Sequence, residues 1–468
     1  MPENFVRRFE ATARRFADRP AILWDGGALT YRELAARAGG FARFLAHRGV
    51  KAGDRVALDI PNRWPFPVAF LGALTLGATA APLDPRLTGE ERRAIVDDLA
   101  PAVVAHEVVG DEAAWPTADP VETPALILYT SGSTGRPKGA VLSHGALGFA
   151  VESWADPVMA LGPNDVVLAV LPFSHSFGLN GALLAPLLTG AQVVLLERFS
   201  PEAALRAIRD HGVTVFPGVA TMFRRLLDLG VGRSDVASLR VAVSGAAPCP
   251  WELAEEWRER TGVRIVRGYG MTELFRPISY LARDPTDRPD AIGRAVPGVE
   301  VRIVDDAGRA LGAGEAGELL IRSPAAMDGY WGAPEETCAV LENGWFRTGD
   351  LATVTAEGLV RIEGRKRERI LRGGYSVFPA EVEAALLAHP AVAEAAVVGV
   401  AHAELGEEVA AFVVLQAGAR AGADELAGWC KERLAAFKYP RRVTIVGELP
   451  KGPTGKVLKA KLAAQRPA

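Results

Sequence analysis

The sequence predicts a multidomain α/β and α+β protein, with a large N-terminal domain and a small C-terminal domain. Over roughly the first 290 residues, short apolar runs alternate with helical stretches, which is typical of βαβ units around a mostly parallel sheet. Further along, short strands are separated by glycine-containing turns, which predicts a meander or small β-barrel. The last part of about 100 residues has the alternating elements of a small α+β domain.

Helices are predicted where apolar residues recur at helical spacing or where a capping signal occurs. Thr30 to Glu33 is a capping box that opens one helix. The apolar stretch from Val68 to Pro82 is too short to span a membrane and is interpreted as a buried helix. The other predicted helices cover residues 5–16, 65–76, 201–211, 379–387 and 423–437.

Strands are predicted where short apolar runs are bounded by turn residues. The first group covers residues 54–59, 125–129, 166–170, 193–196, 213–216 and 241–243. The second group covers residues 299–304, 317–322, 351–355, 359–362, 395–400 and 409–415. A segment dense in charge and glycine, residues 364–374, precedes the last two strands. We therefore predict an N-terminal domain of residues 1–366 and a C-terminal domain of residues 367–468.

Composition excludes several classes of protein. The 468 residues include 53 basic and 56 acidic ones, so the net charge of −3 argues against a nucleic-acid partner. Cys249, Cys338 and Cys430 are isolated, which argues against a disulfide framework or a thiolate metal site. The N-terminus lacks the apolar core of a signal peptide, and no apolar run is long enough for a membrane span. The expectation is a cytoplasmic protein.

Residues Thr130 to Gly139, TSGSTGRPKG, directly follow a predicted buried strand. Glycines let backbone N–H groups approach phosphate oxygens, hydroxyls add donors, and Lys138 adds a positive charge. The segment is not the P-loop of nucleotide hydrolases, because Lys138 follows Pro137 and precedes Gly139. The alternative to a phosphate site is a polar surface loop.

This ten-residue segment resembles the signature loop of the adenylate-forming superfamily, which includes acyl-CoA synthetases, luciferases and the adenylation domains of peptide synthetases. Further segments resemble the family's motifs and follow in the family's order. They are RGYGMTE at residues 267–273, GWFRTGD at 344–350, the hinge region at 364–383 and PKGPTGK at 450–456. The resemblance extends over about residues 5–461 and is nearest to the AMP-forming acyl-CoA synthetases.

The resemblance implies a two-step reaction with ATP and CoA as cosubstrates and Mg²⁺ as cofactor. A small-molecule carboxylic acid attacks the α-phosphate of ATP to give an acyl-adenylate, and the thiol of CoA then displaces AMP. One alternative is that the acyl group is passed to the phosphopantetheine of an acyl carrier protein. An alternative of another class is a nucleotide-binding homologue that has lost catalysis.

The resemblance also implies roles for single residues. Lys456 would bridge the substrate carboxylate and the α-phosphate, Thr272 would contact that phosphate, and Glu273 would hold Mg²⁺. Asp350 would bind the ribose hydroxyls with help from Arg365. The implied ATP and AMP site comprises Thr130, Ser131, Gly132, Ser133, Thr134, Gly135, Lys138, Gly245, Ala246, Ala247, Pro248, Gly268, Tyr269, Gly270, Met271, Thr272, Asp350, Arg365 and Lys456.

His175, Gly268 and Phe275 are the expected neighbours of the acyl group, and His175 is counted with the catalytic residues. Gly373 and Gly374 would line the CoA entry, and Arg367 would be the hinge of a mobile lid. Arg267 and Arg276 would either pair with a second substrate carboxylate or form structural salt bridges.

Lysine is scarce in this chain, with only nine lysines among the 53 basic residues. Two of them, Lys138 and Lys456, fall in the two loops where an ammonium directed at phosphate is expected. Lys459 and Lys461 are interpreted as solvated lysines of the C-terminal tail.

Overall fold

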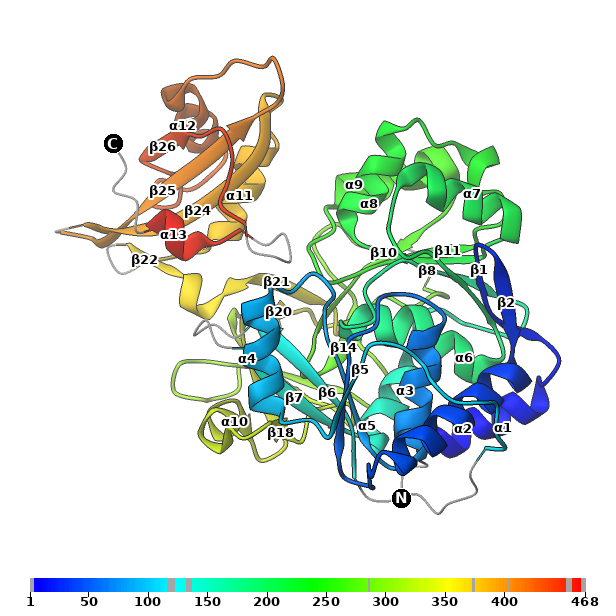
Figure 1. The fold of residues 1–468 in the computed structure, drawn as a ribbon. Coiled ribbons are helices and arrows are strands. Elements are labelled where there is room, and N and C mark those ends of the chain that lie inside the picture. The colour runs from blue at the N-terminus through cyan, green and yellow to red at the C-terminus, as the bar shows by residue number, and fades with distance from the viewer. Residues whose placement is uncertain are drawn as a thin grey trace. The chain divides into compact units, whose positions relative to one another are not determined.

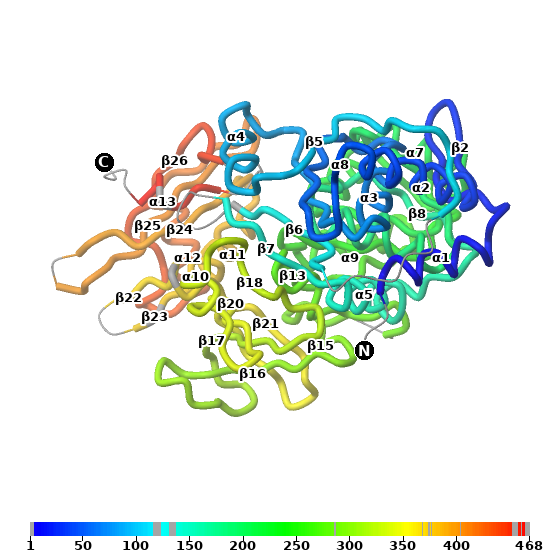
Figure 2. Tube along the Cα trace, turned by 60° about the horizontal axis from the view of Figure 1, so that its bottom comes forward, coloured from blue at the N-terminus to red at the C-terminus, as the bar shows by residue number. Residues whose placement is uncertain are grey.

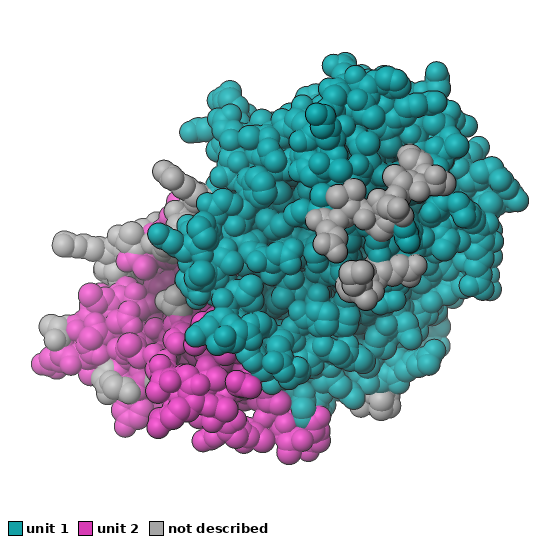
Figure 3. All heavy atoms as spheres, turned by 90° about the horizontal axis from the view of Figure 1, so that it is seen from below, with its two compact units in different colours: residues 1–301, 321–346, 358–360 teal, residues 302–320, 347–357, 361–468 magenta. Residues whose placement is uncertain are grey.

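The computed structural model of the 468-residue chain describes residues 4–115, 123–131, 137–284, 287–372, 375–402, 404–451 and 457–463. The chain groups into two compact units, which Figure 3 shows in separate colours. Unit 1 comprises residues 1–301, 321–346 and 358–360, and unit 2 comprises residues 302–320, 347–357 and 361–468. Within the described ranges, every helix is too short or too polar to cross a lipid bilayer.

The first sheet of unit 1 has seven strands (Figure 1). In sheet order these are β12 (Ile265–Val266), β11 (Val241–Ser244), β10 (Val215–Gly218), β8 (Val166–Ala169), β9 (Gln192–Leu195), β1 (Pro20–Trp24) and β2 (Gly27–Thr30). The edge strand β2 runs antiparallel to β1, and the other neighbouring pairs are parallel. Strands β8 and β11 are buried along their whole length, as expected for parallel strands covered on both faces.

Helices cover both faces of this sheet (Figure 1). One face carries α7 (Pro201–His211), α8 (Ala220–Asp228), the short turn η3 (Arg233–Val236) and α9 (Trp251–Thr261). The other face carries η2 (Phe177–Leu184) and α6 (Ala185–Thr189). Helix α7 begins after Ser200, whose hydroxyl accepts from Ala203 N at 3.1 Å, and ends before Gly212, whose φ is +61°. These capping residues explain why the sequence defines both ends of α7.

The second sheet of unit 1 has six strands. In sheet order these are β18 (Gly329–Tyr330), β7 (Pro137–Ser143), β6 (Pro124–Ser131), β4 (Thr79–Pro82), β3 (Arg55–Leu58) and β5 (Val103–Ala105). Strands β6 and β7 form an antiparallel hairpin, and β18 adds antiparallel to β7. A segment nearly 200 residues beyond the hairpin therefore lies directly beside it, as the pairing of Tyr330 with Ala140 shows.

The remaining helices of this part of the chain surround the second sheet or lie between the two sheets (Figure 1). They are α1 (Phe5–Arg15), α2 (Tyr31–His47), α3 (Pro65–Thr75), α4 (Gly89–Leu99), α5 (His144–Ser153) and η1 (Trp154–Val158). Helix α4 covers one face of the second sheet with Ile95 and Leu99, and α3 and α5 contact the other face. Almost every residue of α3 is buried, as its position between layers requires.

Several short strands follow these sheets in the chain. A three-stranded sheet has the order β13 (Gly268–Met271), β14 (Phe275–Ser279) and β15 (Arg294–Ala295). A five-stranded sheet has the order β16 (Glu300–Val304), β17 (Gly317–Arg322), β20 (Trp345–Val354) and β19 (Leu341–Glu342), with β21 (Val360–Arg365) also paired to β20. Helix α10 (Pro334–Val340) precedes β19.

The C-terminal part of unit 2 is an α+β fold (Figure 2). After the turn η4 (Lys366–Glu368), its sheet has the order β23 (Tyr375–Val377), β22 (Ile370–Arg372), β25 (Gly406–Leu415) and β24 (Val392–His402), with β26 (Arg442–Ile445) paired to β25. Helices α11 (Pro379–Leu387) and α12 (Ala423–Lys431) pack on the face that carries Val397. Helix α13 (Lys459–Ala463) packs through Leu462 on the face that carries Val398. Successive residues of β24 thus point to opposite faces, as a strand requires.

Much of the predicted element order is confirmed. The bounds of α7, β17 and α11 agree with the prediction, and Thr30 and Glu33 form the predicted capping box of α2. The predicted fold class of layered α/β structure followed by α+β structure is also confirmed.

Three predictions differ from the structure. The stretch from Val68 to Pro82 is not one helix, because α3 ends at Thr75, Gly77 takes a φ of +77° and strand β4 begins at Thr79. Helix α12 ends at Lys431 rather than at Phe437. In the strand order of the described residues, the five-stranded sheet stays open and forms no closed barrel. Turn signals therefore predicted these strands but not their pairing.

Candidate active site

The hairpin of β6 and β7 positions the first phosphate-binding candidates. Thr130 pairs with Lys138 and Ser131 pairs with Pro137, so the two strands bring both ends of the glycine-rich loop together. Gly132, Ser133, Thr134 and Gly135 lie outside the described residues. Side chains at directly paired positions share one face of the hairpin. The side chains of Thr130 and Lys138 therefore project from the same face of the hairpin.

Among the described residues of unit 1, Lys138 has little charge compensation. Its Nζ lies 5.4 Å from the ring centroid of Tyr330 and 3.9 Å from Glu336 Oε1, at the outer limit of an ion pair. The side chain is only 20% exposed, so much of its hydration is removed. An ammonium in this state is suited to bind the oxygens of a phosphate group.

Glu273 lies in the tight turn between β13 and β14, where Met271 pairs with Phe275. A Cβ at residue 270 would lie 2.1 Å from the Phe275 carbonyl oxygen, so this turn requires Gly270. The hydroxyl of Tyr330 donates to Glu273 Oε1 at 2.8 Å. Burial, and next the charge of Glu273, raise the pKa of Tyr330, so this hydroxyl keeps its proton.

The donor set around Glu273 fits a magnesium ion that arrives with a nucleotide. Mg²⁺ is commonly held by one or two carboxylates together with substrate phosphates and water. Within the described parts of the chain, no cluster of three or more histidine, cysteine or acidic side chains is arranged as a metal cage. Glu273 supplies one carboxylate, with Oε2 not engaged by Tyr330. The residues present therefore fit a metal shared with phosphate.

The segments predicted to hold adenine follow the carboxyl ends of two neighbouring strands of the first sheet. Strands β11 and β12 are parallel neighbours, and they lead into Gly245–Pro248 and into β13 with Tyr269. Ala246, Ala247 and Pro248 are exposed, and Tyr269 is half-buried. The carboxyl edge of a parallel sheet is where ligands bind in open α/β folds.

Arg276 is buried behind these segments. Its guanidinium donates to Ser244 O at 2.8 Å, to Val266 O at 3.2 Å and to Ser279 Oγ at 3.0 Å, so it joins the ends of three strands. Burial lowers its pKa to about 9. A Cβ at Gly268 would lie 2.4 Å from Nη2, so the guanidinium fills the space that this glycine leaves.

The second arginine considered for a substrate carboxylate, Arg267, forms an ion pair with Asp287 at 3.4 Å between Nε and Oδ2. Its guanidinium also lies 4.9 Å from the ring of Trp251. This arrangement is the structural salt bridge that the sequence left open as one alternative. Phe275, an expected neighbour of the acyl group, is buried and has a φ of +55°.

His175 is part of a charged cluster that the sequence did not predict. Its Nε2 lies 3.0 Å from Asp84 Oδ2 and 3.1 Å from Arg86 Nη2. Burial opposes the charge of Asp84, but the hydrogen bonds from His175 and Arg86 outweigh it and hold the pKa of Asp84 well below its ordinary value. The cluster therefore holds the imidazole by one of its two nitrogens. Asp84 lies two residues beyond Pro82, the last residue of β4, in a stretch that the sequence did not predict to end in a strand.

In unit 2, Asp350 and Arg365 lie on the paired strands β20 and β21. Arg365 Nε is 2.7 Å from Asp350 Oδ1, and Asp350 is buried. The structure thus brings together the two residues expected at the ribose.

The remaining predicted residues of unit 2 are described in part. Lys456, Gly373 and Gly374 lie outside the described residues, and for Arg367 the backbone lies in η4. Lys451 and Val457 form a β-bridge that closes the base of the lysine loop. The interpretation of Lys459 as a solvated lysine is wrong, because its Nζ lies 2.9 Å from Glu368 and 2.8 Å from Glu383.

Comparison with known proteins decides the family. Residues 9–120 and 106–331 match the family described as AMP-binding enzyme, and residues 381–456 match its C-terminal domain. The chain belongs to the AMP-binding enzyme family. The resemblance to the adenylate-forming superfamily is therefore confirmed.

Three relatives represent this family. A feruloyl-CoA synthase of Amycolatopsis is 36% identical, with 96% of each chain covered. A long-chain-fatty-acid–CoA ligase of Bacillus subtilis is 30% identical, with 96% of this chain and 92% of that protein covered. The structure of the o-succinylbenzoate coenzyme A synthetase of Bacillus subtilis, in complex with ATP and a magnesium ion, has a TM-score of 0.88 and is 30% identical, with 97% and 98% of the chains covered.

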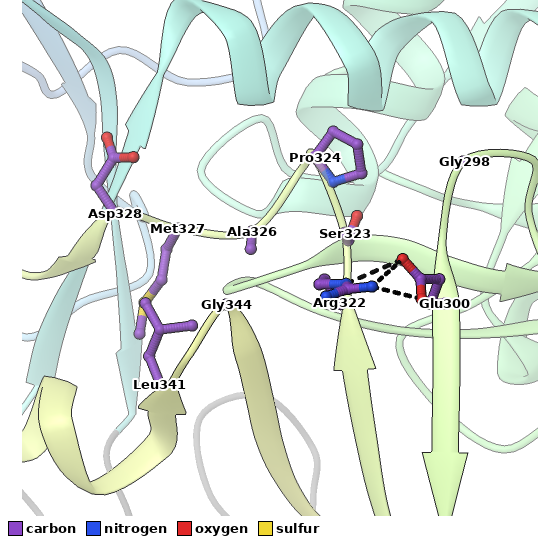
Figure 4. A pocket seen from close by; sticks show the side chains of 10 residues that line it. All are labelled: Gly298, Glu300, Arg322, Ser323, Pro324, Ala326, Met327, Asp328, Leu341 and Gly344. Atoms are coloured by element: carbon purple, nitrogen blue, oxygen red, sulfur yellow. Dashed lines mark hydrogen bonds and ion pairs between the residues drawn. The ribbon is translucent and has the colours of Figure 1, made fainter.

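This AMP-binding enzyme also has a surface hollow of about 560 Å³ in unit 1 (Figure 4). An ion pair between Arg322 and Glu300, with Nη2 and Oε1 2.6 Å apart, borders it on one side. Its other lining residues are Gly298, Ser323, Pro324, Ala326, Met327, Asp328, Leu341 and Gly344. None of the candidate nucleotide residues that the structure describes lines this hollow.

Proposed function

We propose that the chain activates a carboxylic acid with ATP and transfers the acyl group to the thiol of CoA. It is an AMP-forming acyl-CoA synthetase, that is, an ATP-dependent carboxylic acid–thiol ligase. The observation that carries the assignment of the site is that Lys138 and Glu273, from separate motifs, both contact Tyr330. An ammonium and a carboxylate on one aromatic side chain suit a phosphate group and the metal bound to it.

In the first step, a carboxylate oxygen attacks the α-phosphorus of ATP and pyrophosphate leaves. Two anions approach each other, so positive charge at this point should contribute most of the rate enhancement. Lys456 bridges the carboxylate and the α-phosphate, and Lys138 and the Thr272 hydroxyl bind phosphate oxygens. Magnesium, when bound, supplies further positive charge to the phosphates, and Glu273 is the residue that would hold it.

The rest of the nucleotide would be bound by side chains that orient it without reacting. Asp350 accepts hydrogen bonds from the ribose hydroxyls, with Arg365 fixing its carboxylate. Tyr269 stacks on adenine, opposite Gly245–Pro248. The support for these roles is the salt bridge of Asp350 with Arg365 and the common edge of β11 and β12.

In the second step, the thiol sulfur attacks the acyl carbonyl and AMP leaves. His175, held by Asp84, borders the route between the acyl group and the thiol, and Gly373 and Gly374 line the thiol entry. Because the two steps need different groups at one adenylate, residues 367–468 would rotate about Arg367 between them. CoA is the proposed acceptor because the relatives named above are CoA enzymes.

The test is pyrophosphate release from ATP across a panel of aliphatic, aromatic and dicarboxylic acids of graded length. We expect release with one class of acid and thioester formation when CoA is added. Binding of ATP without pyrophosphate release from any acid would favour the inactive homologue. Thioester formation on a phosphopantetheinylated carrier protein, but not on free CoA, would favour the carrier-protein acceptor.

Substitution Lys456→Ala tests the first step directly. We expect ATP–pyrophosphate exchange to fall by about 10²–10³-fold or more, because a charge that stabilises the transition state is lost. The melting temperature should be unchanged, and Lys461→Ala, on the exposed side of α13, is the control. Near-normal exchange in the Lys456 variant would contradict the assignment.

A further inference from the structure

Tyr330 lies between two charged groups that come from different motifs. Its hydroxyl donates to Glu273 Oε1 at 2.8 Å, and its ring lies 5.4 Å below the ammonium of Lys138. One half-buried side chain therefore contacts the carboxylate expected at the metal and the ammonium expected at the phosphates.

The backbone holds Tyr330 firmly in this place. Strand β18 pairs Tyr330 with Ala140 of β7, two residues beyond Lys138. The flanking main chain continues the attachment, because Trp331 N donates to Gly139 O at 2.7 Å. Tyr330 N itself donates to Thr337 Oγ1 of α10 at 2.9 Å. The ring thus has a defined position relative to the strand that carries Lys138.

The same segment also holds the turn of Glu273. Met327 N donates to the main-chain oxygen of Glu273 at 2.9 Å, and Met327 is buried. Residues 327–330 therefore hold Glu273 at its backbone and at its carboxylate. A residue held at its backbone and at its carboxylate loses conformational freedom before any ligand arrives, which reduces the entropy lost on binding.

The two halves of the tyrosine make separable contributions. The hydroxyl donates to Oε1 of Glu273, so Oε2 is the carboxylate oxygen that Tyr330 does not engage. The ring attracts the ammonium through its electron-rich face, and this attraction does not need the hydroxyl. A phenylalanine would keep the ring and remove the hydroxyl, and a leucine would remove both.

We infer that Tyr330 is a positioning residue that orients the Glu273 carboxylate with its hydroxyl and the Lys138 ammonium with its ring, so that both are set for magnesium-bound ATP. This inference rests on the proposed function, because it takes ATP as the ligand. Tyr330 acts through Glu273 and Lys138 and takes no direct part in the reaction.

The experiment is calorimetric titration of the full chain with α,β-methylene-ATP, which cannot be cleaved at the α-phosphate, with and without Mg²⁺. For Tyr330→Phe we expect about tenfold weaker binding with Mg²⁺ and unchanged binding without it, since the hydroxyl acts through the carboxylate. For Tyr330→Leu we expect weaker binding under both conditions, since the aromatic ring that attracts the Lys138 ammonium is also lost.

The matched control is Tyr129→Phe on β6 of the same sheet, which removes a tyrosine–carboxylate hydrogen bond of 2.6 Å to Asp98 of α4. It should bind as the unmodified chain does. The double variant Glu273→Ala/Tyr330→Phe should bind no more weakly than Glu273→Ala alone, because the hydroxyl then has no acceptor. Thermal melting checks that each variant folds.

Three outcomes would overturn the inference: unchanged binding by Tyr330→Phe with Mg²⁺, equal weakening with and without Mg²⁺, or a full further loss on the Glu273→Ala background. Pyrophosphate release by the unmodified chain is measured in parallel. If the analogue binds but no acid releases pyrophosphate, the proposed function fails, and the binding data still decide the role of Tyr330.

Discussion

Lys138 of unit 1 and Lys459 of unit 2 are almost equally exposed, at 20% and 23%, yet their charges are compensated very differently. Among the residues that the structure describes, the carboxylate paired with Lys138 is 3.9 Å away, whereas Lys459 lies within 2.9 Å of Glu368 and 2.8 Å of Glu383. Exposure therefore does not distinguish the lysine proposed to bind phosphate from the lysine that pairs with two carboxylates. The two lysines differ instead in the number of carboxylates close to the ammonium.

The electrostatics of Lys459 agree with a structural role. Burial opposes its charge, but Glu383 and Glu368 outweigh that effect and raise its pKa. Glu383 belongs to α11, and Glu368 ends the turn η4. Lys459 thus joins the helix that follows the lysine loop to the segment that precedes the C-terminal fold.

The largest effect is expected for Lys138→Ala. ATP–pyrophosphate exchange should fall by about 10²-fold, because one positive charge at the phosphates is lost. The free energy of unfolding should change by less than about 0.5 kcal/mol, because no close ion pair is broken. Lys51→Ala, at an exposed site, is the control for both measurements. A large loss of stability with normal ATP–pyrophosphate exchange would instead give Lys138 the structural role assigned to Lys459.

A smaller effect of the opposite kind is expected for Lys459→Ala. The free energy of unfolding of unit 2 should fall by about 2 kcal/mol, because Glu368 and Glu383 are left facing each other without a cation. The measurement is hydrogen exchange of α11 and α13 in urea. Lys461→Ala in the same helix is the control, and Glu383→Gln should restore part of the loss. Unchanged exchange would show that Lys459 is dispensable.

The third prediction concerns the pH dependence of stability. His144 is buried at the start of α5, its Nδ1 has no hydrogen-bond partner among the described residues, and burial lowers its pKa to about 4. The unfolded chain binds this proton below about pH 6.5, so stability is present above that pH and is lost as the pH falls towards 4.

At pH 5.5 the loss should be about 1 kcal/mol of unfolding free energy relative to neutral pH. His144→Gln should remove this part of the pH dependence, and His211→Gln, at an exposed site, should leave it. The measurement is urea unfolding between pH 7 and pH 5. An identical pH dependence for the His144 variant would show that its charge is accommodated in the folded state.

The candidate site residues that the sequence predicts lie in contiguous motifs. Lys138 was predicted from the glycine-rich segment and Glu273 and Asp350 from the resemblance of their motifs to the family, and Asp350 has its expected partner in Arg365. Tyr330 and Asp84 were missed because their contacts join distant segments, Tyr330 to Glu273 across 57 positions, and no local pattern records such a contact. Lys459 was misinterpreted for the same reason, since Glu368 is 91 positions away.

The prediction of helices and strands has the same limit, because contacts between distant segments are not visible in a local pattern. Helix α7 was predicted correctly because its Ser200 cap and Gly212 stop lie in its own sequence. Strand β13 was missed because its glycines argue against a strand, and it forms by antiparallel pairing with β14. Closure of a barrel depends on pairing between the end strands, which turn signals do not encode.

The close approach of Gly270 to the Phe275 carbonyl oxygen restricts the substitutions that the turn of Glu273 can tolerate during evolution. Every other amino acid carries a Cβ, and a Cβ at this position would lie 2.1 Å from that oxygen. A point mutation in the glycine codon that alters the residue is therefore unfavourable whatever it encodes. Variation between enzymes with this turn must enter through the residues around it.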